Sequence, residues 1–181
     1  MASLDDNALS DLRGRTIGFI SQTLNLIPVL SVRRRGRRFV TVYPMDVLKL
    51  MEEHSPFNRL LGIRGESLEP GRVVMTLPPR DDLVGDPRRP ALHGGVVATL
   101  VDTAGGAAAW SSLAPGESVS TVGLSVDYLE PAGLGAALRA EATLVRKGNR
   151  VCHVRVSVTQ GDVLVAEGRG LYSIHRPRAK A

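Results

Sequence analysis

The sequence predicts an α+β domain in which one long helix covers the apolar face of an antiparallel sheet. Five segments after residue 70 alternate apolar and polar side chains with a period of two, which is typical of strands with one buried face. After residue 60 only one segment, from about Gly94 to Ser112, has the length and composition of a long helix. A single long helix set among several strands indicates an α+β layout.

Residues 1–42 are expected to form a basic extension, separate from a domain at 43–181. They hold seven arginines against three aspartates, which gives +4 of the total net charge of +5. Residues 8–28 predict a helix with Ser10 as its N-cap. The arginine-rich run at 33–38 is typical of a solvated linker. Contact with an acidic membrane surface, a nucleic acid or a ligand phosphate is the alternative, and the lack of interleaved aromatic residues disfavours nucleic acid.

The compartment is predicted from the start of the chain and from its single cysteine. Acids stand in ASLDDNALSD where a secretory signal needs basic residues, and the apolar stretch 16–30 is too short and too polar to span a bilayer. Cys152 alone excludes an intramolecular disulfide and a cysteine-based zinc site. His54, His153 and His175 lack metal-ligand spacing. We therefore expect a cytoplasmic protein with no metal site.

The strands are expected after a short helix at 45–54, which a Ser-Pro pair ends. The segment 71–78 places Val73, Met75 and Leu77 on one face. Further strands are expected at 120–129, 135–145, 150–159 and 162–175, with glycine-containing turns at 147–149 and 160–162. In the segment 120–129 the alternation predicts Val122, Leu124, Val126 and Tyr128 on one face, and Thr121, Gly123, Ser125 and Asp127 on the other.

The long helix has almost no polar face, which predicts burial on all sides. Gly105 and Gly106 each cost about 1 kcal/mol relative to alanine in a helix interior, so we expect them to allow close approach of a curved sheet or a second helix. A long helix wrapped by a curved antiparallel sheet is the hot-dog fold. Asp102 is the exception in this helix, because burying an ionised carboxylate costs several kcal/mol unless it is paired or hydrogen-bonded. It either fixes the helix through a hydrogen bond or acts as a base or nucleophile.

His93, Gly94 and Gly95 stand at the N-terminus of this helix. The first amides of a helix lack intrahelical partners and carry a partial positive charge, so they suit a carbonyl oxygen that gains negative charge. Gly95 and Asp102 are seven residues apart, which is about 10 Å along the axis and too far for one helix to close a site around one carbonyl carbon. A second, antiparallel copy of the helix across a dimer axis would bring the two features together.

The segment HGGVVATLVDTAGGAAA (93–109) resembles the hot-dog thioesterases of the phenylacetic-acid-degradation (PaaI) type, which have Asp nine residues after His-Gly-Gly. TVGLSVDYLEPA (121–132) resembles the next strand of that family, and VRKGNR (145–150) its glycine-containing hairpin. The resemblance covers roughly residues 50–175. It implies a homodimer or a dimer of dimers, with active sites at the subunit interface, that hydrolyses an acyl- or aryl-CoA thioester. CoA is then part of the substrate and no cofactor is needed.

The resemblance also implies roles for individual residues. The amide of Gly94 or Gly95 would polarise the thioester carbonyl, and Asp102 of the partner subunit would activate water or attack directly. His93 would orient the thioester or the loop. Thr121 would hold the nucleophilic water, with Ser120 as the alternative if the loop is one residue longer.

The CoA phosphates would meet the hairpin at Arg146, Lys147 and Arg150, although such side chains are often only solvated. The family usually has Asn six residues before the histidine. Here Asp86, seven residues before, is the nearest match, and its carboxylate would oppose an oxyanion unless Arg88 or Arg89 pairs with it. This departure motivates a second hypothesis, an acyl-CoA-binding protein without turnover. A dehydratase of the same fold is a third, which the position of His93 at the helix cap disfavours.

Overall fold

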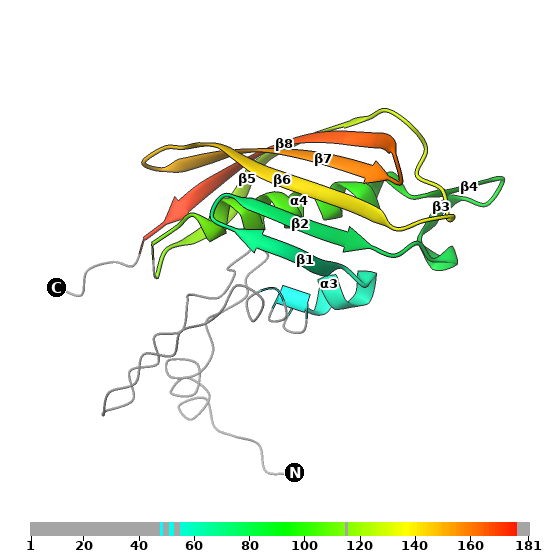
Figure 1. Cartoon of the computed structure of the whole chain (residues 1–181), viewed down its shortest axis with the longest axis horizontal. Coiled ribbons are helices and arrows are strands. Elements are labelled where there is room, and N and C mark those ends of the chain that lie inside the picture. Colours follow the sequence, from blue (N-terminus) through cyan, green and yellow to red (C-terminus); the bar gives the residue numbers. More distant parts are fainter. Residues whose placement is uncertain (1–47, 49–50, 53–54, 115, 177–181) are drawn as a thin grey trace, which may run out of the picture.

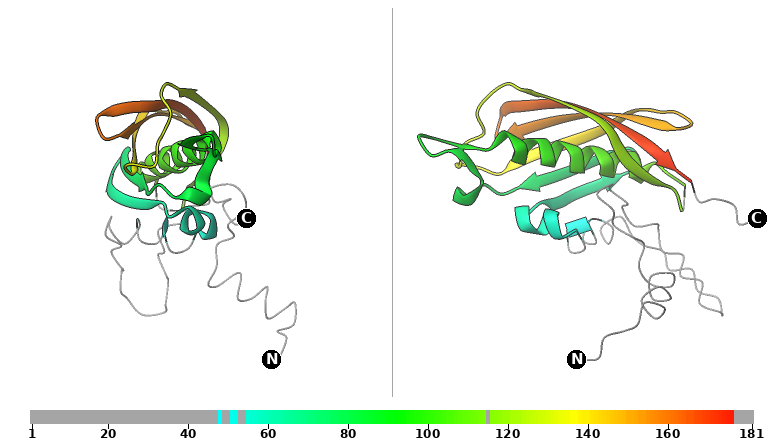
Figure 2. Two further views of the ribbon diagram at one scale, coloured as in Figure 1. Left: turned by 90° about the vertical axis from the view of Figure 1, so that its right-hand side faces the viewer. Right: turned by 180° about the vertical axis from the view of Figure 1, so that it is seen from behind.

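The computed structural model describes residues 48, 51–52, 55–114 and 116–176. Within them a six-stranded antiparallel sheet curves around one long helix, α4 (Gly94–Ser111), as Figures 1 and 2 show. The predicted hot-dog fold is therefore confirmed. The expected helix at 8–28, the arginine run at 33–38 and the domain boundary at 42 lie outside the described residues.

The sheet has the strand order β1-β2-β6-β7-β8-β5, so β1 and β5 are its edges. Its strands are β1 (Arg64–Glu69), β2 (Arg72–Leu77), β5 (Ser118–Tyr128), β6 (Leu138–Lys147), β7 (Val151–Gln160) and β8 (Val163–His175). Short hairpin turns join β6 to β7 and β7 to β8, as the glycines of these turns predict. All neighbouring strands are antiparallel, and along the regular stretches of each strand alternate residues face α4.

The core lies between the sheet and α4, and the predicted alternation locates it well. Val73, Met75 and Leu77 of β2 are buried as expected. The predicted inward faces of β6 and β7 are also correct, since their apolar residues are buried or nearly so: Leu138, Ala140, Ala142, Leu144, Cys152, Val154, Val156 and Val158. With few aromatic residues in the chain, the core is built from aliphatic side chains packed on the alanine-rich helix.

The prediction for the faces of β5 is wrong in part. Between Thr121 and Gly123 the register with β8 shifts, so Val122 is an extra residue in β5. Thr121 is paired with the buried Tyr172 and faces α4, whereas Val122 is 61% exposed. The bulge therefore places Thr121 on the same face as Leu124, which period-two alternation had separated.

Several further elements were not predicted. A short helix, α3 (Pro56–Leu61), begins where the Ser-Pro pair was expected only to end a helix, because Ser55 caps it and proline suits the first helical position. A small hairpin of β3 (Val84–Asp86) and β4 (Arg89–Leu92) precedes α4, and a 3-10 turn (Asp81–Leu83) leads into it. In the helix expected at 45–54, the described residues Leu48, Met51 and Glu52 are helical, and the first two are buried.

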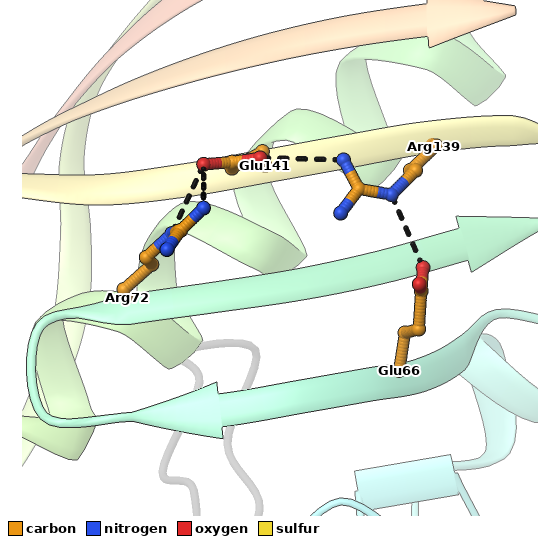
Figure 3. A network of polar contacts seen from close by, with 4 residues as sticks. All are labelled: Glu66, Arg72, Arg139 and Glu141. Carbon is orange, nitrogen blue, oxygen red and sulfur yellow. Dashed lines mark hydrogen bonds and ion pairs between the residues drawn. The ribbon is translucent and has the colours of Figure 1, made fainter. Parts of the chain in front are cut away.

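The outer face of the sheet carries paired charges. Figure 3 shows a row in which Arg72 and Arg139 both contact Glu141, and Arg139 also contacts Glu66. These side chains come from β2, β6 and β1, and they are solvated on the face away from α4.

Among the described residues, no helix is both long enough and apolar enough to cross a membrane.

Candidate active site

The N-terminus of α4 is capped by its own preceding histidine. His93 has extended backbone angles, and its Nδ1 accepts a hydrogen bond from the amide of Gly95 at 2.9 Å. The amide of Gly94 donates to no acceptor within the described residues. Of the two glycine amides predicted to receive a carbonyl oxygen, Gly94 is thus the one left open, and His93 has the role of a cap.

Asp102 lies in the middle of α4, half-buried and facing β5. Its Oδ1 accepts a hydrogen bond of 2.8 Å from the hydroxyl of Thr121. Burial raises the pKa of the Asp102 carboxyl, and hydrogen bonds from Thr121 and Tyr172 oppose part of that rise. Within the described residues no cationic side chain pairs with it. A carboxylate bonded only to neutral donors is suited to accept a proton.

Tyr172 of β8 packs directly beneath this part of the helix. It is fully buried, and its hydroxyl donates to the main-chain oxygen of Asp102 at 3.1 Å. A Cβ at Gly105 would overlap the Tyr172 hydroxyl, which explains why the helix has glycine there. The pair of glycines predicted close approach at this point of the helix, but the sequence did not point to Tyr172 as the partner. The only signal in the sequence was a tyrosine in phase with glycines 168 and 170 on one strand.

One stripe of α4 is left open by the surrounding sheet. Gly95, Ala98, Thr99 and Asp102 follow each other at helical spacing and are at least partly exposed, so the predicted burial on all sides is wrong for a single chain. The stripe runs beside the edge strand β5, which exposes apolar side chains, including Val122, Leu124 and Tyr128. Gly94 and Asp102 are eight residues apart, which is about 12 Å along the helix axis.

A cavity of about 310 Å³ adjoins the open end of the helix. Its mainly apolar lining includes Leu92, Gly94, Val97, Tyr128, Leu129 and Val165. The hydroxyl of Tyr128 donates to the main-chain oxygen of Gly94 at 3.0 Å, which fixes the first turn of α4 against the end of β5.

Within the described residues, the remaining predicted residues form no hydrogen bond with Asp102 or with the amide of Gly94. Asp86, on β3, pairs with the side chain and amide of Arg88, which lowers the pKa of its carboxyl. This is the pairing with Arg88 that was expected to turn the carboxylate away from an oxyanion. Ser120 is buried and contacts His175, whereas Thr121 contacts Asp102.

The basic hairpin between β6 and β7 lies at the opposite end of α4. Lys147 donates to the main-chain oxygen of Ser112 at 2.7 Å, just past the C-terminus of the helix. Since α4 has 18 residues, it is about 27 Å long. Arg146, Lys147 and Arg150 are therefore far from Gly94 within one chain.

Within the described part of the chain, no group of three or more His, Cys, Asp or Glu residues could hold a metal ion.

Residues 90–167, which include α4 and most of the sheet, match the sequence profile of the thioesterase superfamily. The medium/long-chain acyl-CoA thioesterase YigI of Salmonella typhimurium is 34% identical over 147 residues, which cover 71% of this chain and 94% of that protein. The chain belongs to the thioesterase superfamily. It is a hot-dog thioesterase of the PaaI type, and its reaction class is thioester hydrolysis.

Other members of the superfamily are similar over the same part of the chain. Human acyl-coenzyme A thioesterase 13 is 31% identical over 132 residues, which cover 68% of this chain and 89% of that protein. The Escherichia coli PaaI protein of the phenylacetic acid degradation operon superposes with a TM-score of 0.64 at 25% identity. That match covers 73% of this thioesterase and 91% of PaaI.

Proposed function

We propose that this thioesterase hydrolyses an acyl- or aryl-CoA to the free acid and CoA, with Asp102 as the general base. The observation that carries the proposal is the state of Asp102. It is half-buried on an apolar helix, its pKa is raised, and Thr121 donates to it. A carboxylate that only holds the helix in place would be expected to pair with a cation, or to have all its acceptor positions occupied by hydrogen-bond donors.

The first turn of α4 supplies the second part of the chemistry. The open amide of Gly94 is suited to donate to the thioester oxygen. Asp102 takes a proton from water, and the hydroxide bonds to the carbonyl carbon while the oxygen gains negative charge. When the carbonyl re-forms, the C–S bond breaks, and the CoA thiolate takes up the proton that Asp102 held. In the alternative, the Asp102 carboxylate attacks the carbonyl carbon, the C–S bond breaks, and CoA leaves as the thiolate from a mixed anhydride. Water then opens the anhydride, which frees the acid and the Asp102 carboxylate and supplies the proton that CoA takes up.

A homodimer follows from the separation of the two groups. Because about 12 Å along the helix separates Gly94 from Asp102, one chain cannot place both against one carbonyl carbon. The open stripe of α4 and the uncovered apolar edge of β5 form a continuous surface, which a monomer would expose at risk of aggregation. Two copies with antiparallel helices would cover it and bring Asp102 of the partner near Gly94. Light scattering, which tests for the dimer, would also show whether two dimers associate.

The hairpin of Arg146, Lys147 and Arg150 fits the CoA phosphates only in such a dimer. With antiparallel helices, the C-terminal end of one α4 extends past the N-terminus of the other. The partner's basic hairpin would then stand beyond Gly94, within reach of the nucleotide end of CoA. The apolar cavity beside Gly94 would receive part of the acyl group or pantetheine. The name of YigI suggests medium- or long-chain substrates as the first to try.

The test is release of free thiol from phenylacetyl-, benzoyl-, hexanoyl- and palmitoyl-CoA by wild type and Asp102→Asn. We expect turnover of at least one substrate and a loss of a hundredfold or more in the variant, which keeps the size and one acceptor of the side chain. If neither protein releases CoA, yet acyl-CoA raises the melting temperature of both, the protein is a binder and Asp102 is structural. Light scattering of wild type at several concentrations checks the dimer.

A further inference from the structure

We propose that Tyr172 is a positioning residue for the reaction. Together with Thr121, it fixes the position of Asp102, on α4, relative to the sheet. This inference rests on the proposed function of Asp102. It starts from the register of the sheet, in which Thr121 of β5 and Tyr172 of β8 are direct cross-strand partners. Residues paired in this way point to the same face. Their two hydroxyls therefore approach the helix side by side, from two strands, at the same residue.

The two hydroxyls hold different atoms of Asp102. Thr121 donates to the carboxylate, and Tyr172 donates to the main-chain oxygen at 3.1 Å. A helical carbonyl already accepts from the amide four residues later, and its second lone pair is available for the phenol. One contact thus orients the side chain, and the other fixes the height and rotation of that turn of α4 over the sheet.

The β-bulge at Val122 is part of the same arrangement. Thr121 and Leu124 are three residues apart, so regular alternation along β5 would place Thr121 on the face opposite to Leu124, away from α4. With the bulge, Thr121 reaches Asp102, and Leu124 and Tyr128 still face the helix side farther along the strand. The strand therefore departs from regular pairing just where Asp102 needs a donor.

Glycines leave the space that Tyr172 occupies. A Cβ at Gly105 on the helix would overlap the Tyr172 hydroxyl, and a Cβ at Gly170 on β8 would overlap its ring. Two chain segments thus give up side chains for one tyrosine, although glycine in a helix interior costs stability. A phenylalanine would still need Gly170, because a Cβ there meets the ring, but it would remove the closest contact at Gly105, which is with the hydroxyl oxygen. The glycine at position 105 therefore indicates space left for the hydroxyl.

The phenol also acts on the ionisation of Asp102. Burial raises the pKa of Tyr172, so the group remains a neutral donor across the working range of pH. The phenol hydroxyl, placed next to Asp102, lowers the pKa of the carboxyl below what burial alone would give. From the sheet, the titratable groups facing this point within the described residues are Tyr172 and Cys152, which pairs with it on β7 and has a thiol pKa raised by burial. Neither brings a charge near the carboxylate.

Tyr172→Phe tests the proposal, measured as kcat, KM and the pH profile of kcat/KM on the best acyl-CoA. We expect kcat to fall about three- to tenfold, the worth of one hydrogen bond, with KM nearly unchanged. The acid limb of the profile should move to higher pH, because the phenol hydroxyl beside Asp102 no longer lowers the pKa of its carboxyl. Thr121→Val should move the limb in the same direction and serves as the matched comparison. A Tyr172→Phe enzyme with unchanged kcat and pH profile would overturn the proposal and leave Asp102 catalysis intact.

A double-mutant cycle tests, independently of turnover, whether Gly105 makes room for the Tyr172 hydroxyl. Gly105→Ala should lower the melting temperature strongly, since its methyl group meets the phenol oxygen. In the Tyr172→Phe background the nearest ring carbon is 3.0 Å away, so the same alanine should cost clearly less. Equal costs in both backgrounds would mean that the glycine does not serve the hydroxyl, and would overturn the proposal. If wild type hydrolyses no acyl-CoA while Asp102→Asn is equally inert, the proposed function fails first and the positioning role with it.

Discussion

Two carboxylates on this fold have opposite surroundings. Glu141 lies on the outer face of the sheet, where Arg72 and Arg139 contact it and lower the pKa of its carboxyl (Figure 3). Asp102 lies on the inner side, on α4, where burial raises the pKa and only hydroxyl groups donate to it. The surroundings of Glu141 thus stabilise its ionised form, whereas those of Asp102 favour the protonated form.

The difference separates a structural carboxylate from a reactive one. Paired, solvated carboxylates contribute a little to stability and have no tendency to take protons at neutral pH. A poorly solvated carboxylate with neutral donors costs stability, and this cost is typical of functional sites. The contrast between Glu141 and Asp102 can therefore be tested with matched changes on the two faces of one sheet.

The largest expected effect is on activity. Asp102→Asn should lower kcat/KM a hundredfold or more, about 2.7 kcal/mol of transition-state stabilisation. Glu141→Gln removes the same kind of charge from the outer face and should change kcat/KM less than about twofold, since it touches nothing near α4. Both are measured by CoA release on one substrate. A comparable loss in the two variants would mean that the charge of the molecule, rather than the site, governs turnover.

The next effect concerns the close packing beneath the helix. A Cβ at Gly168 of β8 would overlap the side chain of Val101 on α4. Gly168→Ala should therefore cost about 1–3 kcal/mol of unfolding free energy, as overpacking of a dense core does. Gly135→Ala is the control, because a Cβ there meets nothing within 4 Å. Urea unfolding of both variants measures the difference, and equal stabilities would show that the sheet can move off the helix freely.

Most of this architecture can be predicted from the sequence, for a simple reason. Strands β6 and β7 lie in the middle of the sheet with one face on the helix, so burial imposes a strict alternation that can be read directly. The spacing of His93 and Asp102 is local to one helix, and it gave both candidate residues. The pairing of Asp86 with Arg88 was also within reach, because the two residues are close in sequence.

The features that the sequence does not predict depend on strand register or on contacts between segments distant in the sequence. The bulge at Val122 adds one residue to β5 without a distinctive composition, and it decides that Thr121 rather than Ser120 reaches Asp102. The role of Tyr172 needs the alignment of β8 under α4, which no local pattern encodes. The hairpin at Lys147 was linked to the site by resemblance, and only the fold shows that it lies at the far end of the helix.

The pH dependence of stability gives a smaller effect with opposite signs on the two faces. Because the folded-state pKa of Asp102 is raised, its ionised form destabilises wild type above that pKa, and the cost disappears once the pH falls below the unfolded value. Asp102→Asn should therefore melt a few °C higher than wild type at pH 8 and converge with it near pH 4. Thermal denaturation from pH 4 to pH 8 measures this. A variant that melts lower at pH 8 would show that the ionised carboxylate supports the fold.

The smallest effect is that of Glu141 on stability. Its folded-state pKa is lowered, so its contribution is present above the unfolded value of about 4.3 and is lost as the pH falls through the folded value. Glu141→Gln should cost less than about 1 kcal/mol at pH 7, since the pairs are partly solvated. In urea unfolding the cost should shrink in 1 M salt and at acid pH, whereas Glu167→Gln, on the same sheet and without an ion pair among the described residues, should cost nothing at any pH. A cost that persisted in salt and acid would mean that Glu141 acts through packing, and the contrast with Asp102 would then rest on position rather than on solvation of charge.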